Sequence, residues 1–362
     1  MLIILTMAKE LDLGSIRIKS KELKLFEKKD EDLWKAISEL DEDILTIIEL
    51  YKDNNNFELL LDAHDENFLR GSVSPDPEKK VCGARVMVLP NGEKLARAGF
   101  SLFAKDLMFN FDNDECLWDV CYTNASKSKT YLYTESKVQL EQDKKLRLVE
   151  KFEKHYLEIL ENCEEKIKQR NCETVYLALY VMLKTFIRVG NIEYYKRFNH
   201  KGLTTLQIKD ISIDNNFITF EFIGKDGVPQ KITKRFEDFF IKKFKKLIGN
   251  RDKEEFLFVN ENNNVLHSDY FSKILFQWTE EHFYPHIIRS HFADMTCKEF
   301  LKKHRTATKQ QVEQVFLEIA ENLGHKKYNK KTDTWEICFN VTLKNYIHPS
   351  YSDRMIKLYS NE

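Results

Sequence analysis

The stretch that decides the fold class is residues 211–233, ISIDNNFITFEFIGKDGVPQKIT. It holds short runs of alternating apolar and polar residues, separated by Asn215-Asn216 and by Lys225-Asp226-Gly227. Alternation with a period of two residues predicts strands, and Asn, Asp and Gly between such runs predict turns. The stretch therefore predicts a three-stranded β-meander with Lys225 at the tip of a hairpin.

Helical periodicity surrounds this meander. Residues 144–161 have apolar positions at helical spacing, residues 175–187 form the apolar body of a second predicted helix, and helical patterns resume after the meander. Strands inserted among helices are typical of an α+β domain. We therefore predict a mostly helical domain over residues 141–362 that carries the meander.

The region before residue 141 has a different pattern. Turn residues separate short alternating runs, which predict a small β-rich domain over residues 76–140. The runs are 81–89, 99–103, 117–123 and 130–134.

The N-terminal part is acidic and has helical spacing. Residues 20–52 place Leu33, Ile37 and Leu40 at intervals of three and four, which predicts amphipathic helices. Residues 71–77, GSVSPDP, are the best linker candidate in the chain. We therefore predict that residues 1–75 form an acidic helical extension.

Composition excludes several classes of protein. The 362 residues are 42% apolar and include only 11 Gly and 6 Pro, which argues for a globular chain rather than a collagen-like or low-complexity one. No run approaches the ~18 apolar residues of a membrane span. The apolar residues 1–7 lack a basic start and are too short for a signal peptide. Seven cysteines without a CxxC pair suggest neither disulfides nor a zinc site. We expect an intracellular protein, in the nucleus, the cytoplasm or a virion.

Charge is unevenly distributed although the formal net charge is only -1. Residues 1–80 contain 12 basic and 19 acidic residues, whereas residues 196–254 contain 14 basic and 8 acidic residues. A basic segment in the second half suits a protein that holds a phosphate backbone there.

No Walker loop, GxGxxG, HExxH or acidic pair at metal spacing is present in the sequence. This absence argues against most chemistry driven by nucleotides or metals, and we expect no cofactor. What remains is a scattered set of residues that are ordinary one by one but informative in their order and context. They are Arg188 in IRVGN, Lys225 in FIGK, Arg289 after Ile288, His325 in LGH and Tyr346 in YIHP.

This series, together with residues 202–206 (GLTTL), resembles the type IB DNA topoisomerases, most closely the compact poxvirus and bacterial kind. Residues 118–124 (WDVCYTN) and 131–133 (YLY) resemble the end of the small N-terminal domain of that family. The resemblance covers roughly residues 80–350, and residues 1–75 match nothing in the pattern.

The resemblance implies that Tyr346 attacks a DNA phosphodiester, forms a 3′-phosphotyrosyl link, releases a 5′-hydroxyl and later reseals the strand. Without a metal, charge on the phosphorane oxygens must be stabilised by cationic or polar side chains, here Arg188, Arg289 and His325. Lys225 is the general acid for the leaving oxygen in this interpretation. Neither ATP nor a metal is then required.

Two departures keep alternatives open. His286 stands three residues before Arg289, where the family commonly has Lys, and this HxxR pattern is more typical of tyrosine recombinases. A recombinase or integrase is therefore the second hypothesis, and a catalytically inactive DNA-binding module is the third. The stretch between His325 and Tyr346 is longer than usual, so an insertion is implied. Tyr328 and Tyr351 remain alternative nucleophiles.

The expected partner is double-stranded DNA, bound by a monomer that clamps it between its two domains, with no membrane or nucleotide involved. The residues predicted to contact DNA are aromatic or basic, and they are Tyr131, Tyr133, Tyr194, Tyr195, Lys196 and His286.

Overall fold

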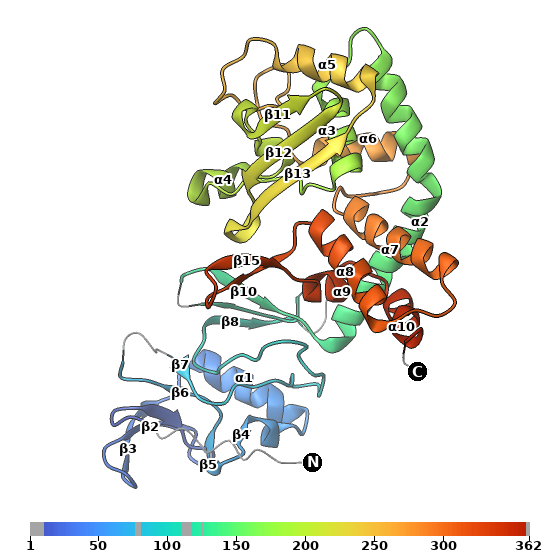
Figure 1. The fold of residues 1–362 in the computed structure, drawn as a ribbon. Coiled ribbons are helices and arrows are strands. Elements are labelled where there is room, and N and C mark those ends of the chain that lie inside the picture. Colours follow the sequence, from blue (N-terminus) through green and yellow to red (C-terminus); the bar gives the residue numbers. More distant parts are fainter. Residues whose placement is uncertain (1–10, 77–80, 111–117, 125, 360–362) are drawn as a thin grey trace. The chain divides into compact units, whose positions relative to one another are not determined.

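The computed structural model describes residues 11–76, 81–110, 118–124 and 126–359. The chain divides into two compact units, residues 1–143 and 144–362 (Figure 1). The predicted α+β class is confirmed, with strands concentrated in the first unit and helices in the second. Within the described residues, no helix is long and apolar enough to cross a membrane.

The described residues of the first unit form short strands in three sheets. Its largest sheet has the strand order β3-β2-β1-β6-β7, and the two others are β10-β9-β8 and β4-β5. The elements of this unit are β1 (Ile16–Ile18), β2 (Lys24–Lys28), β3 (Trp34–Glu39), α1 (Glu42–Asp53), the 3-10 helix η1 (Phe57–Leu60), β4 (Leu61–Asp62), β5 (Asp65–Leu69), β6 (Ser72–Val73), β7 (Val81–Cys82), β8 (Lys105–Phe109), β9 (Val120–Thr123) and β10 (Lys129–Leu132).

The helical prediction for residues 20–52 is wrong before residue 42. Strands β2 and β3 form an antiparallel hairpin there, closed by a hydrogen bond from the Lys29 amide to the Leu33 carbonyl at 2.8 Å. Leu33 and Ile37, which suggested a buried helix face, are 59% and 43% exposed. A register shift between Leu25 and Phe26 interrupts the pairing, and such a bulge breaks the alternation that would have signalled strands.

The predicted linker at residues 71–77 is part of the largest sheet, and its last residue, Pro77, lies outside the described residues. Strand β6 pairs with β1 on one side and β7 on the other. One hydrophobic core joins Ile18 and Ile48 to Phe100 and Val120. Described residues on both sides of the predicted boundary at residue 75 therefore share one core, which a separate extension would not do.

The second unit is mostly helical. It contains the sheet β11-β12-β13 and a separate hairpin. Its elements, with a first helix that begins before residue 144, are α2 (Glu135–Lys168), α3 (Thr174–Thr185), α4 (Ile192–Phe198), η2 (Leu203–Thr205), η3 (Ile208–Asp210), β11 (Ile211–Asp214), β12 (Phe217–Ile223), η4 (Lys225–Gly227), β13 (Pro229–Arg235), α5 (Asp238–Ile248), α6 (Ser268–Thr279), α7 (Ile287–Lys303), α8 (Lys309–Asn322), β14 (Lys326–Asn329), β15 (Thr334–Ile337), α9 (Asn340–Asn345) and α10 (Pro349–Lys357).

The predicted meander is confirmed. Its strands are antiparallel, and β12 pairs with β13 along its length and with β11 from Phe217 to Phe220. Ile218, Phe220 and Phe222 alternate along β12 and are buried, because one face of the sheet packs on the core. Helix α3 packs against β13 and α5 in the same core (Figure 1). This packing fixes the hairpin that carries Lys225 at its tip.

The stretch between His325 and Tyr346 contains a hairpin, β14–β15, followed by α9. The predicted insertion therefore has regular structure. Tyr346 and Ile347 are buried in a second core of this unit, which α7, α8 and α10 also form.

Candidate active site

Arg188 lies in the turn that follows α3. Phe186 ends this helix in a left-handed conformation with φ 58°. The Arg188 carbonyl accepts a hydrogen bond from the Leu203 amide at 2.7 Å. Gly202 is required here, because a Cβ would lie 2.7 Å from the Arg188 carbonyl oxygen and 2.6 Å from Cα of Gly190. Close backbone packing therefore fixes where the Arg188 side chain begins.

Arg289 lies in the first turn of α7 and is 3% exposed. Its Nη1 donates to the Phe186 carbonyl, and its Nη2 donates to the Leu323 carbonyl at 2.7 Å. Its Nε is buried and has no hydrogen-bond partner in the described part of the chain. Burial and the nearby Arg188 lower the pKa of Arg289 to about 10, so it is still a cation at neutral pH. Backbone carbonyls thus orient a desolvated cation, which favours an anionic ligand.

His325 follows the end of α8 and faces both arginines. Its Nε2 lies 3.3 Å from Nη2 of Arg188 and 3.2 Å from Nη2 of Arg289, while its Nδ1 lies 2.8 Å from Oγ1 of Thr342. Because guanidinium nitrogens only donate, Nε2 accepts here and we assign the proton to Nδ1. Burial, Arg289 and Arg188 lower the pKa of His325 to about 3. The imidazole is therefore neutral at pH 7.

Tyr346 follows α9 and completes this cluster. Its hydroxyl oxygen accepts a hydrogen bond from Nη2 of Arg188 at 3.3 Å. The centre of its ring lies 5.2 Å from Cζ of Arg289 and 4.8 Å from the centre of the His325 ring. The side chain is buried, with 6% of the residue exposed. Tyr346 is thus surrounded by the three other residues for which we predicted phosphate chemistry.

Two opposing effects act on the ionisation of Tyr346. Burial raises the pKa of its phenol, because it disfavours the phenolate. The charges of Arg289 and Arg188 and their hydrogen bonds outweigh that effect, and the pKa is lowered overall. The surroundings of Tyr346 therefore favour the form that can act as a nucleophile.

Lys225 lies at the tip of the β12–β13 hairpin and has an exposed side chain. It lines one pocket together with Arg188, Gly202 and Arg289. The following residue, Asp226, has a left-handed backbone with φ 60°, as expected for a tight turn. Lys225 therefore faces the same pocket as the two arginines from a different element.

Two contacts hold the outgoing strand of this hairpin. Nε2 of Gln230 donates to the Gly324 carbonyl at 3.1 Å, next to His325. Nζ of Lys326 donates to the Pro229 carbonyl at 2.8 Å. The hairpin is thus attached to the segment that carries His325.

His286 lies directly before α7 and next to Tyr346, with 5.1 Å between ring centres. Although the residue as a whole is exposed, desolvation of its ring and the charges of Arg289 and Lys145 lower its pKa. It is therefore neutral near pH 7 and lies close enough to contact a ligand bound at the cluster.

Tyr328 and Tyr351 lie in different surroundings. The Tyr328 hydroxyl donates to Asp333 within the β14–β15 hairpin, which raises the pKa of Tyr328. The Tyr351 ring packs 5.3 Å from His348. In the described part of the chain, Tyr346 is the only one of the three candidate nucleophiles that contacts Arg188 and Arg289.

The other residues predicted to bind DNA lie on two elements. In the first unit, Tyr131 and Tyr133 at and beyond strand β10 are 44% and 41% exposed. On α4 of the second unit, Tyr194 is 56% exposed, whereas the Tyr195 ring packs edge-on against Phe256 at 5.3 Å. Lys196, also on α4, forms an ion pair with Glu193 at 3.4 Å. The contacts of these five residues with DNA remain a prediction.

Some residues of the site carried no sequence signal. Thr342 bonds to His325 from α9. Nζ of Lys145, on α2, lies 5.3 Å from the centre of the Tyr346 ring and donates to the Asn345 carbonyl. These contacts join residues far apart in the chain, and no local pattern marks them. Carboxylate Oδ1 of the buried Asp294 accepts the amide of His348 at 2.7 Å and supports the same segment.

Comparison with known families identifies the class of protein. Residues 135–346 match the catalytic core of eukaryotic DNA topoisomerase I, and this match covers more than half of the chain. The chain therefore belongs to the eukaryotic DNA topoisomerase I catalytic-core family. The predicted resemblance to the type IB DNA topoisomerases is confirmed.

Viral topoisomerases are among its relatives. The chain is 31% identical over 97 residues to DNA topoisomerase 1 of Rabbit fibroma virus (strain Kasza), which is 26% of this chain and 31% of the relative. It is 34% identical over 102 residues to DNA topoisomerase 1B of Vaccinia virus (strain Copenhagen), which is 27% of this chain and 32% of the relative. The chain thus spans about a third of the length of these relatives.

Solved structures with some similarity include the XerH site-specific recombinase bound to the palindromic difH substrate in a post-cleavage complex. The sequence identity is 20%, the TM-score is 0.31, and the match covers 46% of this chain and 44% of that chain. For the pre-cleavage complex with difH substrate, the identity is 22% and the TM-score is 0.32, with 46% of each chain covered.

Proposed function

We propose that the protein is a type IB DNA topoisomerase, which relaxes supercoiled duplex DNA by transient cleavage of one strand. The observation that carries the proposal is the cluster around Tyr346. Its hydroxyl lies 3.3 Å from Arg188, while Arg289 and His325 lie next to its ring. A nucleophile with cationic and polar donors around it suits attack on a phosphodiester.

In the proposed cleavage step, the Tyr346 hydroxyl loses its proton to water and the phenolate oxygen attacks the phosphorus. A bond forms between phosphorus and the tyrosine oxygen, and the bond between phosphorus and the 5′ oxygen breaks. The leaving 5′ oxygen takes a proton from the Lys225 ammonium. Resealing reverses these steps, so the 3′-phosphotyrosine conserves the bond energy and no ATP is consumed.

Negative charge builds up on the non-bridging oxygens in the transition state. Arg188 and Arg289 supply planar, charged donors for these oxygens. His325 supplies a third donor only with a proton on Nε2. A bound phosphate favours that proton, since a nearby anion raises the pKa of an imidazole.

A tyrosine recombinase is the second candidate, because His286 and Arg289 form the HxxR pattern and His286 lies beside Tyr346. The same chemistry would then serve strand exchange between two DNA duplexes. Four protein copies would act together, whereas we propose a topoisomerase that acts as a monomer on one duplex.

Plasmid relaxation distinguishes these functions. We expect the purified protein to remove supercoils from a plasmid in the presence of EDTA and without ATP, at a rate per molecule that does not change with protein concentration. A requirement for magnesium or nucleotide would contradict the proposed chemistry. Recombinant products that require a second DNA site, without free relaxation, would favour the recombinase.

A further inference from the structure

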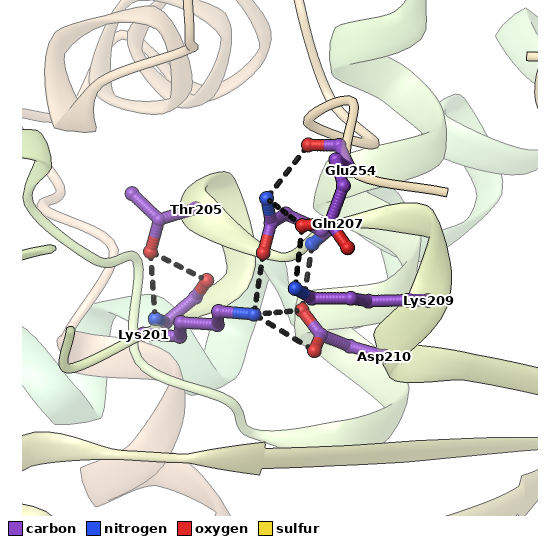
Figure 2. Close-up of polar contacts among 7 residues, drawn as sticks. Lys201, Thr205, Gln207, Lys209, Asp210 and Glu254 are labelled. Carbon is purple, nitrogen blue, oxygen red and sulfur yellow. Dashed lines mark hydrogen bonds and ion pairs between the residues drawn. The ribbon is translucent and has the colours of Figure 1, made fainter. Parts of the chain in front are cut away.

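A buried ion pair between Lys201 and Asp210 lies at the pocket that Lys225 and the two arginines line. Neither residue of the pair takes part in the proposed cleavage step. Nζ of Lys201 lies 2.8 Å from both carboxylate oxygens of Asp210 and 2.8 Å from Oε1 of Gln207 (Figure 2). The side chains of Lys201 and Asp210 are only 7% and 8% exposed. An ammonium has three N–H donors, and these three acceptors match them.

The acceptors are themselves held in place. Oδ2 of Asp210 accepts the backbone amide of Gln207 at 2.7 Å, which closes the turn η3. Nε2 of Gln207 donates to the Glu254 carbonyl at 2.6 Å (Figure 2). The Lys201 ammonium is thus bound to a braced turn rather than to mobile surface side chains.

The backbone of Lys201 connects this anchor to the hairpin. Its amide donates to the Ile223 carbonyl at 2.7 Å, two residues before Lys225. Arg188 and the next residue are held differently, because the Leu203 and Thr204 amides bind their carbonyls at 2.7 Å. A shift of Lys201 therefore reaches strand β12, which leads to Lys225, through one direct hydrogen bond. It reaches Arg188 only through the residues that follow Lys201 in the chain.

We infer that the Lys201–Asp210 ion pair positions the hairpin tip so that Lys225 reaches the leaving oxygen. Lys201 is then a positioning residue for proton donation, an inference that rests on the proposed function. A buried ion pair is a poor source of stability because both charges lose their hydration. A role in positioning the hairpin accounts for an ion pair that adds little to stability.

The test compares cleavage of two DNA substrates under single-turnover conditions. One has the ordinary 5′-bridging oxygen, and the other has sulfur there, which leaves readily without a proton. The main variant is the double change Lys201→Met with Asp210→Leu, because either single change leaves a buried charge unpaired and can prevent folding. Lys209→Met is the control. Lys209 lies in the turn η3 with Asp210, but its ion pair with Glu254 is exposed (Figure 2).

We expect the double variant to cleave the oxygen substrate roughly 10- to 100-fold more slowly than wild type, the range expected for a displaced catalytic group. On the sulfur substrate, the loss should shrink to about threefold or less, because no general acid is needed. The single variant Lys201→Arg, which can keep the ion pair, should cleave the oxygen substrate at most of the wild-type rate. The control should match wild type on both substrates.

An equal loss on both substrates would overturn the inference, since it would show a general structural effect or a displaced arginine. No loss on either substrate would overturn it as well. Amide hydrogen exchange at Gly224 and Val228 gives a readout that does not need activity, because their hydrogen bonds close the tip. We expect faster exchange there in the double variant, and unchanged exchange would contradict the positioning role even if wild type failed to cleave DNA.

Discussion

The hydroxyl oxygen of Tyr346 lies 3.3 Å from Nη2 of Arg188, although 158 positions separate the two residues in the chain. Arg188 belongs to the turn after α3, and Tyr346 follows α9. A guanidinium in contact with a buried phenol stabilises the phenolate. This contact brings the first and the last residue of the family's catalytic series into one site.

Replacement of Tyr346 by Phe should abolish both plasmid relaxation and the covalent DNA adduct. Only one hydroxyl is removed, so DNA affinity should change little. The adduct is measured by its altered mobility on a denaturing gel. Tyr328→Phe and Tyr351→Phe serve as matched controls and should form the adduct normally. Adduct formation by the Tyr346 variant would show that another tyrosine is the nucleophile.

Replacement of Arg188 by Gln should raise the pKa of Tyr346, because the phenolate loses a neighbouring positive charge. The phenol absorbs differently when ionised, and subtracting the titration of Tyr346→Phe isolates its signal from those of the other tyrosines. Arg188→Lys keeps the charge and should shift the titration less. A lower or unchanged pKa in Arg188→Gln would contradict the electrostatic role of the contact.

Replacement of Lys225 by Ala should slow cleavage of ordinary DNA roughly 10²- to 10⁴-fold, the range of general acid catalysis. The defect should shrink sharply on the substrate with 5′-bridging sulfur. Arg188→Ala and Arg289→Ala should remain defective on both substrates, because they act on non-bridging oxygens. An equal Lys225→Ala penalty on both substrates would leave this lysine as a binding contact only.

Binding to duplex DNA should weaken steeply with salt, with a log-log slope of about -0.9 per neutralised phosphate. Lys196→Gln should make the slope shallower by about 1 if Lys196 contacts a phosphate. Tyr194→Ala, in which an exposed ring is removed, should weaken binding without changing the slope. Titrations by fluorescence anisotropy at several salt concentrations measure both quantities. A slope near zero for wild type would contradict binding through the phosphate backbone.

The stability of the protein should depend on pH through Asp294. Burial raises the pKa of this carboxyl from 3.8 to about 7, although the His348 amide and Lys298 oppose the shift. The native state therefore binds this proton more tightly than the unfolded state. The resulting stabilisation is complete below about pH 4 and is lost as pH rises to about 7.

Asp294→Asn removes that titration. Its free energy of unfolding, measured with urea, should rise relative to wild type between pH 4 and pH 8 by on the order of a few kcal/mol. Asp353→Asn is the control, since water solvates this exposed carboxylate in both states. A constant difference between wild type and the Asp294 variant across this range would contradict the prediction.

Much of the second unit was predictable from local pattern. The meander over residues 211–233 and the helix near residues 175–187 were predicted close to their observed bounds. The meander alternates with a period of two residues, and the helix is an almost continuous apolar run. The first unit was harder to predict. Its strands are short, and in β3 the apolar residues are largely exposed, so that periodicity in residues 20–40 pointed to the wrong element.

The order and local context of Arg188, Lys225, Arg289, His325 and Tyr346 were sufficient by themselves to indicate the family and its chemistry, because each lies in a short recognisable motif. Only the tertiary structure decided which of three tyrosines lies against the arginines. It also decided that Thr342 orients His325 and that a buried ion pair lies beside the Lys225 hairpin. The physical reason is that a motif records the chemistry of a residue and its chain neighbours. Folding alone brings groups from distant segments within a few ångströms of one another. These groups set the pKa of Tyr346, the protonation of His325 and the position of Lys225.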